Sequence, residues 1–531
     1  MCIAAMSRRP LQLDHAQTRR LAWLAAAALV MIWGFWGVPL VDVDEGAFAE
    51  ATREMVASGN YVSIQLNGEP RTDKPILIYW AQAAAVHLFG VNEFAFRLPS
   101  VIATLLWMAA LYRFGARQGD RDTATVAALL FALSLAVGLI ARAATADALL
   151  NLFIALAMFD IYRHFENGSR ALRLRIALWL GLGFLTKGPI AVAIPLLVSG
   201  GFYLSYRRGR DWLRSVSDPV AVALFLAVVV PWHVAVWWDS GMTFLRGFYL
   251  QHNLGRYSEP LQGHSGGPLY YLWVAPLAVM PFAVWLVATL RHLGRVRTEP
   301  LDRYLWLWFF VVLALFSGSG TKLPHYLLYG MSGLFLLMAR ARAGLRHPWL
   351  HLAPVVVLLL LAAWLPQVFA ALAARTGAAY EHGLFAAAAT AFAGLPQQLA
   401  LLLCLVAGLV IAVRIALWQR LVLLGFVQAA LLGGIIAPTV IGVLQNGPKA
   451  AAQYAREHDK GLVSYRAHQP SLGVYLGQVV RPMPPGPNDW IYTRTDRLEA
   501  LLAQPAAKGG QVVFSDGPAT LVAVGSGGGE P

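Results

Sequence analysis

Long apolar runs constrain this chain more than any other feature. A helix that crosses a hydrocarbon core about 30 Å thick needs roughly 20 predominantly apolar residues. Of the 531 residues, 58% are hydrophobic and only 13% are charged, whereas soluble proteins carry about 25% charged residues. The chain is therefore predicted to be an all-α polytopic membrane protein with about 13 spans. The predicted spans lie near residues 21–41, 95–113, 123–141, 146–162, 172–186, 188–206, 219–238, 268–290, 303–318, 323–340, 351–373, 396–413 and 420–443.

The arginine residues support this count. Four arginines between residues 8 and 20 precede the first span, and the positive-inside rule places such a segment in the cytoplasm. Every second connection should then be rich in arginine. The arginines do gather in alternate connections, at residues 113–121, 163–175, 207–214, 291–303, 340–346 and 414–420. The formal charge of +14 thus orients the protein and does not indicate a nucleic-acid surface.

Two parts of unequal size are predicted. Residues 1–444 form the transmembrane part, whose first apolar run lacks a small-residue cleavage site and is interpreted as a retained anchor. Residues 445–531 form a small α/β soluble domain on the periplasmic side. In it LVSYR and GQVVF are typical of strands, KAAAQYAREHD and RLEALLAQ of helices, and GSGGGEP of a disordered end. The two cysteines, Cys2 and Cys404, indicate no disulfide framework or thiolate metal site.

The outer-face loop 42–94 is predicted to hold amphipathic helices on the membrane surface. Phe48, Ala51 and Met55 share one helical face, opposite a charged face that includes Glu50. Glu50 is therefore expected to face solvent, and Asp42 to be merely interfacial. Turn signals at SGN and NGEP precede a second helix that is expected to start near Pro75.

Ionisable residues cluster on the outer face, at the ends of the predicted spans. Such groups are costly next to lipid, so each is a functional candidate. Each could instead have a purely structural role, because carboxylates cap helices, lysines extend to head groups and histidines lie at interfaces. Such roles do not account for the gathering on one face. The candidates are Asp44, Glu45, Asp73, Lys74, Arg142, Asp147, Lys187, His252, Asn253, Arg256, His264, Lys322, His325 and Tyr326.

The candidates fit phosphate chemistry better than metal chemistry. Lysine and arginine in a partly desolvated cavity make strong contacts with phosphate, and a carboxylate activates or orients an acceptor. His252, His264 and Asp73 have ligand atoms, but their spacing supports no committed metal site. No cofactor is required by this chemistry, and a divalent cation at Asp73 is a weak option.

Several segments resemble a known family, the GT-C membrane glycosyltransferases that use polyprenyl-phosphate sugars. The resemblance is to their aminoarabinose lipid A transferase and protein mannosyltransferase-like branch. It follows the family's order over about residues 40–340 and extends to QPSLGVYLG in the tail. The matching segments are DEGAFAEATREMVASGNYVSIQLNGEPRTDKPILIYW, FRLPS, the pair Arg142 and Asp147, GLGFLTKGPIA, the polar pattern from His252 to Tyr271, and KLPHYLL.

The resemblance implies a GT-C fold and an inverting transfer from undecaprenyl-phosphate sugar on the outer face of the bacterial inner membrane. It implies that Asp44 is the catalytic carboxylate, with Glu45 beside it and Asp147 as a second acid. The donor phosphate is assigned to Lys74, Arg142, Arg256, Lys322 and Tyr326. The acceptor or the cavity wall is assigned to His252, Asn253, His264, His325 and Lys187.

This chain also departs from the family pattern. Relatives commonly read DEGRYAE and FEKPP, where this chain has DEGAFAE and RTDKPI, so Ala47, Phe48 and Asp73 differ. The residues therefore predict the reaction more firmly than the sugar, and the acceptor is lipid A, another lipid or glycan, or a protein. The protein is expected to act as a monomer.

A lipid-linked sugar flippase or secondary transporter is the alternative from another class. Transporters tend to carry inverted repeats and interrupted helices in both halves. We find no repeat in this sequence, and a cluster confined to one face provides no path across the membrane.

Overall fold

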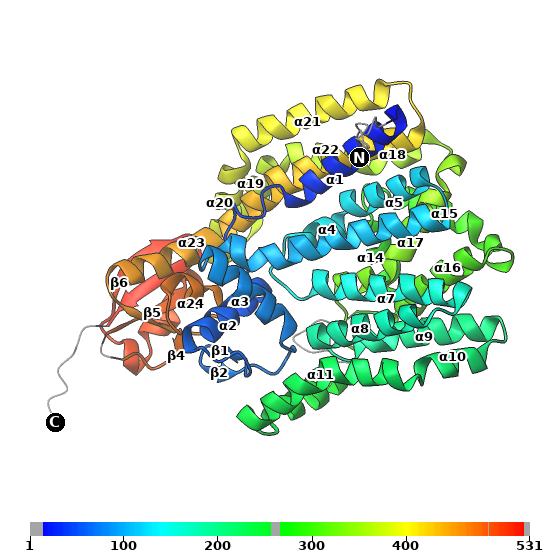
Figure 1. Ribbon diagram of the computed structural model, residues 1–531. Coiled ribbons are helices and arrows are strands. Elements are labelled where there is room, and N and C mark those ends of the chain that lie inside the picture. The colour runs from blue at the N-terminus through cyan, green and yellow to red at the C-terminus, as the bar shows by residue number, and fades with distance from the viewer. Residues whose placement is uncertain (1–13, 256–265, 487, 525–531) are drawn as a thin grey trace, which may run out of the picture.

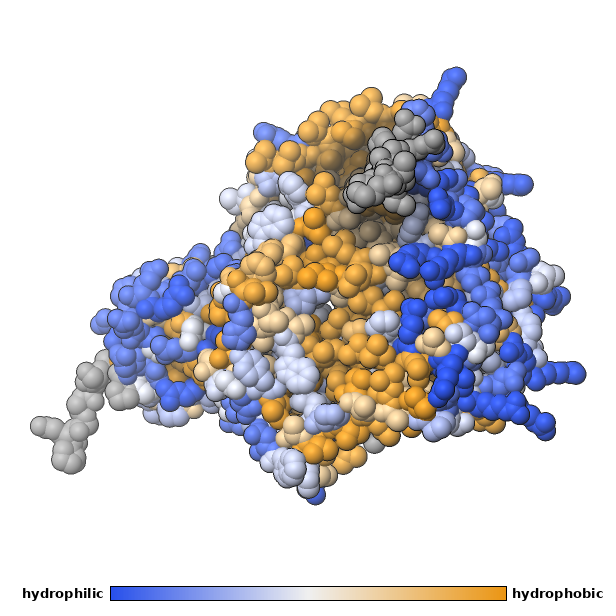
Figure 2. Space-filling view, viewed as in Figure 1, coloured by the Kyte–Doolittle hydropathy of each residue, from blue (hydrophilic) through white to orange (hydrophobic). Residues whose placement is uncertain are grey.

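The computed structural model describes residues 14–255, 266–486 and 488–524. A large helical bundle carries a small β-sheet at one end (Figure 1). In Figure 2 an apolar band runs between two hydrophilic ends, one formed by the region of the sheet and the other by the opposite end of the bundle. Such a band is the surface that a lipid bilayer covers.

The order of elements is almost entirely helical up to residue 457. Here η marks short 3-10 or π-helical segments. The elements of this part are α1 (His15–Ile32), α2 (Asp44–Ser58), β1 (Gln65–Leu66), β2 (Glu69–Pro70), α3 (Leu77–Phe89), α4 (Glu93–Gln118), α5 (Arg121–Leu133), α6 (Leu135–Ala141), α7 (Asp147–Asn167), α8 (Arg170–Lys187), α9 (Ile190–Ser205), α10 (Gly209–Val216), α11 (Pro219–Ser240), α12 (Thr243–Leu245), η1 (Arg246–Leu254), α14 (Tyr270–Ala278), α15 (Ala283–Thr289), η2 (Leu290–Arg297), α16 (Pro300–Ser317), η3 (Pro324–Leu327), α17 (Leu328–Arg340), η4 (Arg342–Gly344), α18 (Pro348–Ala363), α19 (Leu365–Arg375), α20 (Ala379–Phe392), α21 (Leu395–Ala412), α22 (Leu417–Leu431), η5 (Leu432–Ile436) and α23 (Ala437–Glu457).

Helices lie at each of the predicted spans, but the count of about 13 is not confirmed. Within the described residues, six helices are long and apolar enough to cross a membrane, or up to nine if each of three bent pairs is one span. The bent pairs are α5–α6 (68°), α14–α15 (114°) and α18–α19 (62°). Helices α1, α8, α9 and α17 do not meet this criterion of length and composition. Residues 374–395, predicted as a connection, contain the helix α20.

The break between α8 and α9 follows from three residues in sequence. Gly188 has φ +80°, a conformation that L side chains rarely adopt. A Cβ at this position would also collide with the ring of Phe248. Pro189, the residue before α9, has no backbone N–H and so cannot continue the hydrogen-bond pattern of α8. Lys187, the last residue of α8, is thereby placed at the end of a helix.

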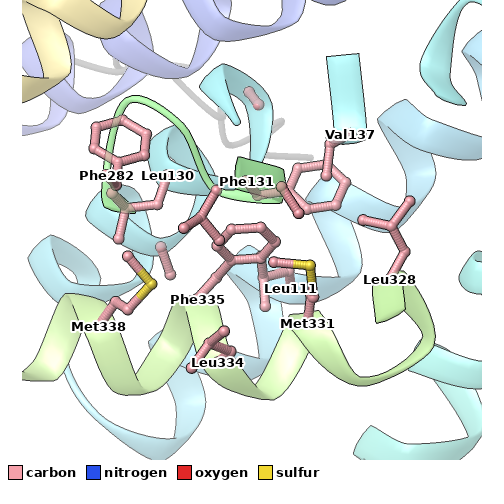
Figure 3. Packing of buried hydrophobic residues seen from close by; sticks show 14 of the residues in the cluster. Leu111, Leu130, Phe131, Val137, Phe282, Leu328, Met331, Leu334, Phe335 and Met338 are labelled. Atoms are coloured by element: carbon pink, nitrogen blue, oxygen red, sulfur yellow. The ribbon is translucent and has the colours of Figure 1, made fainter. Parts of the chain in front are cut away.

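The main core of the bundle is made of aromatic and aliphatic side chains from several helices (Figure 3). Phe131 of α5 and Phe335 of α17 meet edge to face, with ring centroids 5.8 Å apart. Met331 and Met338 of α17 lie on either side of this contact in Figure 3. Inside a membrane, contacts of this kind stabilise the bundle through close van der Waals packing rather than through removal of apolar surface from water.

Helix α2 is buried, which corrects the prediction of a surface helix with Glu50 in solvent. Glu50 is 0% exposed and forms two hydrogen bonds to Arg53, at 2.7 and 2.8 Å. Glu54 accepts the backbone N–H groups of Asn67 and Gly68 in the β1–β2 turn. The charged face of α2 thus packs against protein. The turn signals at SGN and NGEP, the shared face of Phe48, Ala51 and Met55, and the start of α3 near Pro75 are confirmed.

The segment after residue 457 contains the sheet of Figure 1, in the strand order β4-β3-β5-β7-β6. Strand β3 pairs in parallel with β4 and β5, whereas β7 pairs antiparallel with β5 and β6. The strands expected at LVSYR and GQVVF are present as β3 and β6. The elements are β3 (Gly461–Ser464), α24 (Ser471–Leu476), β4 (Arg481–Pro482), β5 (Asp489–Arg494), η6 (Thr495–Arg497), α25 (Leu498–Leu502), η7 (Pro505–Ala507), β6 (Gln511–Asp516) and β7 (Ala519–Ala523).

Candidate functional site

Asp44 lies at the rim of a cavity of about 370 Å³. It is the first residue of α2 and is exposed, and its carboxylate accepts no hydrogen bond from any described residue. The cavity has a polar end that includes Asp44, Asp147 and His325, and apolar walls from α5, α6, α22 and α23. This division suits an amphipathic molecule, whose polar group meets the carboxylates while its apolar part lies between helices.

Glu45 also lines this cavity, but its oxygens are occupied. Arg97 of α4 forms two hydrogen bonds with it, at 2.8 and 2.7 Å. The backbone N–H groups of Val41 and Ala144 complete the set at 2.9 and 2.7 Å. Glu45 therefore joins three separate segments, while the neighbouring Asp44 stays open to the cavity.

Arg97 is a residue of this site that the sequence did not bring forward. It is 2% exposed, and besides Glu45 it donates to the carbonyl groups of Phe35, Val38 and Pro39. A signal was available, because Arg97 lies near the start of an apolar helix, far from the arginines at its other end, and a buried arginine needs a partner. Arg97 fixes the chain between α1 and α2 and so fixes the position of Asp44.

Asp42 is not merely interfacial, as the sequence had suggested. Its carboxylate accepts hydrogen bonds from the backbone N–H and the hydroxyl of Ser471 in α24. Burial raises the pKa of Asp42 to about 6, even though both hydrogen bonds from Ser471 act in the opposite direction. The segment before Asp44 is thus attached to the sheet-bearing part of the chain.

Asp147 is the centre of a second cluster, at the start of α7. Its Oδ1 atom lies 2.6 Å from Nζ of Lys187, 3.0 Å from the hydroxyl of Tyr329 and 3.5 Å from Nε2 of His325. Nζ of Lys187 is also 5.2 Å from the centre of the Tyr326 ring, within the range of a cation–π contact. Lys187 therefore pairs with an acid inside the protein and does not extend to head groups.

A second cavity, of about 130 Å³, is lined by two partners of Asp147, namely Lys187 and Tyr329. Lys74, His252 and Tyr326 also line it, and with Lys187 and Asp73 five predicted residues meet there. Lys322 lies close by in sequence and donates to the carbonyl of Ser319, another wall residue, at 2.6 Å. This cavity is rich in cationic and hydroxyl groups, as a phosphate site requires.

Asp73 also lines the smaller cavity, and it is held by two cations. Arg71 binds both of its oxygens, at 2.7 and 3.2 Å, and Nζ of Lys74 lies 3.2 Å from Oδ2. Burial opposes ionisation, but Lys74 and Arg71 hold the pKa of Asp73 well below its usual range. Both oxygens of Asp73 accept hydrogen bonds from cationic side chains, and the option of a divalent cation at Asp73 stays a prediction. No group of three or more metal-ligating side chains is found in the described ranges.

Arg142 lines the larger cavity but uses its donors elsewhere. It contacts the carbonyl groups of Val30 and Trp33 at the end of α1, and that of Gly138 at 2.9 Å. Its assignment to the donor phosphate stays a prediction. Arg256 and His264 lie outside the described residues, as does the side chain of Asn253.

The chain is similar in sequence to known glycosyltransferases. The family model described as dolichyl-phosphate-mannose-protein mannosyltransferase matches residues 73–237. A relative from Pseudomonas paraeruginosa, an undecaprenyl phosphate-alpha-4-amino-4-deoxy-L-arabinose arabinosyl transferase, is 32% identical over 337 residues. The match covers 61% of this chain, and this chain spans 60% of that relative's length.

Two solved structures share the fold over nearly the whole chain. ArnT from Cupriavidus metallidurans bound to undecaprenyl phosphate has a TM-score of 0.79 and 20% identity, and covers 96% of this chain and 99% of that one. Its apo state has a TM-score of 0.77 and 21% identity, with 96% and 98% coverage. The chain therefore has the same fold as these two structures. The predicted resemblance to the aminoarabinose transferases and the mannosyltransferase-like branch is confirmed.

Proposed function

We propose that this protein is an inverting glycosyltransferase that uses a polyprenyl-phosphate sugar, with undecaprenyl phosphate as the carrier. The observation that carries the proposal is the open carboxylate of Asp44 beside two neighbouring cavities, one amphipathic and one cation-lined. The charge of Asp44 acts on His325, which lines the larger cavity, and on Arg71, which binds Asp73 in the wall of the smaller one. The name of the relative, an undecaprenyl-phosphate aminoarabinose transferase, supports the donor class.

The donor phosphate is assigned to the smaller cavity. Lys74 and Lys187 line it, and Lys322 lies beside its wall residue Ser319. As the bond from the anomeric carbon to the phosphate oxygen breaks, its electron pair stays on the phosphate. Cations that are already in place stabilise this charge without reorganisation. Polyprenyl phosphate is a good leaving group, so the step needs no general acid.

The acceptor is assigned to the larger cavity. Its oxygen attacks the anomeric carbon on the face opposite the phosphate, which inverts the configuration. Asp44 takes the proton of a hydroxyl acceptor, or orients a lipid phosphate that has no proton to lose. Lipid A, another lipid or glycan, and a protein remain the acceptor classes. We assign Glu45 to positioning rather than to proton transfer, because Arg97 and two backbone N–H groups occupy its oxygens.

The setting of the reaction is the periplasmic face of the bacterial inner membrane. The alternation of arginine-rich connections supports 13 spans, a cytoplasmic N-terminus and a periplasmic C-terminal sheet. The proposed enzyme acts as a monomer, binds no nucleic acid and requires no cofactor.

Replacement of Asp44 by Asn tests the proposal. Purified Asp44→Asn protein is incubated with a polyprenyl-phosphate sugar and a membrane lipid extract, and transfer is followed by mass. Loss of transfer of about a hundredfold or more, with unchanged thermal unfolding, is expected. Glu69→Gln, an exposed carboxylate change in β2, is the matched control. Full turnover by Asp44→Asn would refute the role of Asp44. No turnover by the detergent-solubilised wild type would favour the flippase or transporter.

A further inference from the structure

A third cavity lies between helices that have no part in the proposed reaction. Its volume is about 410 Å³, and α7, α8, α9, α10 and α11 line it. Its walls are mainly apolar, with Ile176 and Leu180 from α8, Leu196 from α9, and Val222 and Phe225 from α11. Leu196 and Val222 are 37% and 41% exposed, so the cavity is an open groove on the side of the bundle.

Arg173 of α8 also lines this groove and is only partly satisfied. Its Nη1 atom lies 2.7 Å from Oδ2 of Asp218. Its Nε atom is buried and has no hydrogen-bond partner among the described residues. Because a buried unpaired donor costs about 1–3 kcal/mol, an acceptor atom from a ligand is favoured at this point.

The charges around the groove favour an anion. Arg170 and Arg173 both interact with Asp218, and Arg208 pairs with Asp211 at 2.9 Å. Arg214 lies 3.9 Å from that same Asp211, so arginines outnumber carboxylates. Helices α8 and α11 also begin here, at Arg170 and Pro219, and helix N-termini carry partial positive charge.

Helix α10 closes one side of the groove. Trp212 lines the groove and donates from Nε1 to the hydroxyl of Ser199 on α9, at 2.9 Å. Leu213 and Arg214 on the same helix are exposed. A short helix with this mixture lies in the plane of a membrane interface, where lipid head groups meet the acyl region.

We propose that this groove binds one anionic phospholipid. The acyl chain lies between α8, α9 and α11, and the phosphate accepts hydrogen bonds from Arg173. By the positive-inside rule, the arginine-rich end faces the cytoplasm, so the lipid comes from the inner leaflet. The site is distinct from the cavities at Asp44 and Lys74, and it does not depend on the proposed transfer reaction.

Lipid titration of delipidated protein, followed by native mass spectrometry, tests the site. Phosphatidylglycerol and phosphatidylethanolamine of equal chain length are compared. Phosphatidylglycerol is expected to bind about tenfold more tightly, because both lipids present a phosphate to Arg173 but only phosphatidylethanolamine also brings an ammonium group next to the arginines. Arg173→Gln is expected to remove this preference. Asp218→Asn still caps α11 but no longer competes for Arg173, and it is expected to increase the preference.

Tryptophan substitutions that block the groove distinguish binding at this site from nonspecific binding of lipid to the membrane-facing surface. Val222→Trp on α11 and Leu196→Trp on α9 each place a large side chain in the groove. Because both positions are partly exposed, at least one of the two variants is expected to fold. Both should lose the tight site. Val230→Trp, on an exposed part of α11 outside the groove, is the matched control and should retain it. Equal binding of the two lipids by the wild type, or unchanged binding in a folded groove variant, would overturn the proposal.

Discussion

Asp42 accepts hydrogen bonds from the backbone N–H of Ser471, at 3.0 Å, and from its hydroxyl, across 429 positions of the chain. The contact joins the segment that leads into α2 with the first residue of α24. Arg53 adds a hydrogen bond to the carbonyl of Gly477, and Glu50 packs on Gly473. The helix that begins with Asp44 is therefore held from behind by the C-terminal part of the chain.

Ser471→Ala is expected to loosen this contact. Asp42 would stay buried with one hydrogen bond fewer, at a cost of about 1–3 kcal/mol. Hydrogen exchange of residues 461–476 should become faster, and turnover should fall because α2 is less well held. Ser471→Thr keeps the hydroxyl and should behave like the wild type. Slow exchange in Ser471→Ala would show that the hydroxyl contributes nothing.

The stability of the protein should fall as the pH rises from about 4 to about 6. Burial raises the pKa of Asp42 from 3.8 to about 6, so the folded state retains a proton that the unfolded state has released. The stability linked to this proton is fully present below pH 3.8 and is lost as the pH passes 6. Thermal unfolding at several pH values measures the change, on the order of 3 kcal/mol. Asp42→Asn should make the stability depend less on pH over this range. An unchanged pH dependence in this variant would show that another titratable group causes it.

Glu45 and Asp44 should respond in opposite ways to substitution. Glu45→Ala leaves the buried guanidinium of Arg97 without its carboxylate, which costs about 3–5 kcal/mol. The melting temperature should fall, and transfer by the molecules that remain folded should fall only in part, because Asp44 is still present but is less firmly positioned. Asp44→Asn should leave the melting temperature unchanged and abolish transfer. A Glu45→Met and Arg97→Met double variant should be more stable than Glu45→Ala, because no buried charge is left alone.

Lys187→Met should destabilise the site by about 3–5 kcal/mol, because Asp147 would keep its burial and lose its cation. Thermal unfolding of the single variants and of Asp147→Asn with Lys187→Met measures the coupling between them. The double variant should recover part of the lost stability. Additive losses would show that the two side chains act independently despite the 2.6 Å contact.

Gly46→Ala should disrupt the junction of α2 and α24. A Cβ at Gly46 would overlap the carboxylate of Asp42 and lie 2.7 Å from the backbone nitrogen of Ser471. Alanine in a helix is normally favoured over glycine by about 0.5–1 kcal/mol. A lower stability of the Gly46→Ala protein would therefore show that α24 and Asp42 lie too close to Gly46 for a Cβ atom. Gly408→Ala in α21, where nothing lies within 4 Å, is the control and should be neutral or stabilising. A stable Gly46→Ala protein with normal turnover would contradict this packing.

The sequence predicted turns and helix ends better than it predicted contacts between segments that are far apart in the chain. The NGEP turn and the stop at Lys187-Gly188-Pro189 depend on neighbouring residues, and the structure has them where they were expected. The charged face of α2 was expected to contact solvent. Helical periodicity distinguishes an apolar face from a charged face, but it does not show whether another segment packs against the charged one. Its cover, α24, comes more than 400 positions later in the chain, and no local pattern points to it.

The candidate site shows the same limit. Residues that end a span were readily found, and Asp147, Lys187 and His325 do meet. The sequence did not reveal that Glu45 would be fully engaged while Asp44 stayed open, since the two are adjacent and alike. That difference depends on Arg97, whose guanidinium reaches Glu45 from another helix.

Helix α23 has one further consequence. It supplies Ala437, Pro438 and Ile441 to the wall of the larger cavity, and its other end packs against the sheet at β3, β6 and β7. No flexible tether separates these two ends, because the helix is continuous from Ala437 to Glu457. One helix therefore contacts both the cavity wall and the sheet, so a displacement of the sheet is expected to move the cavity wall as well.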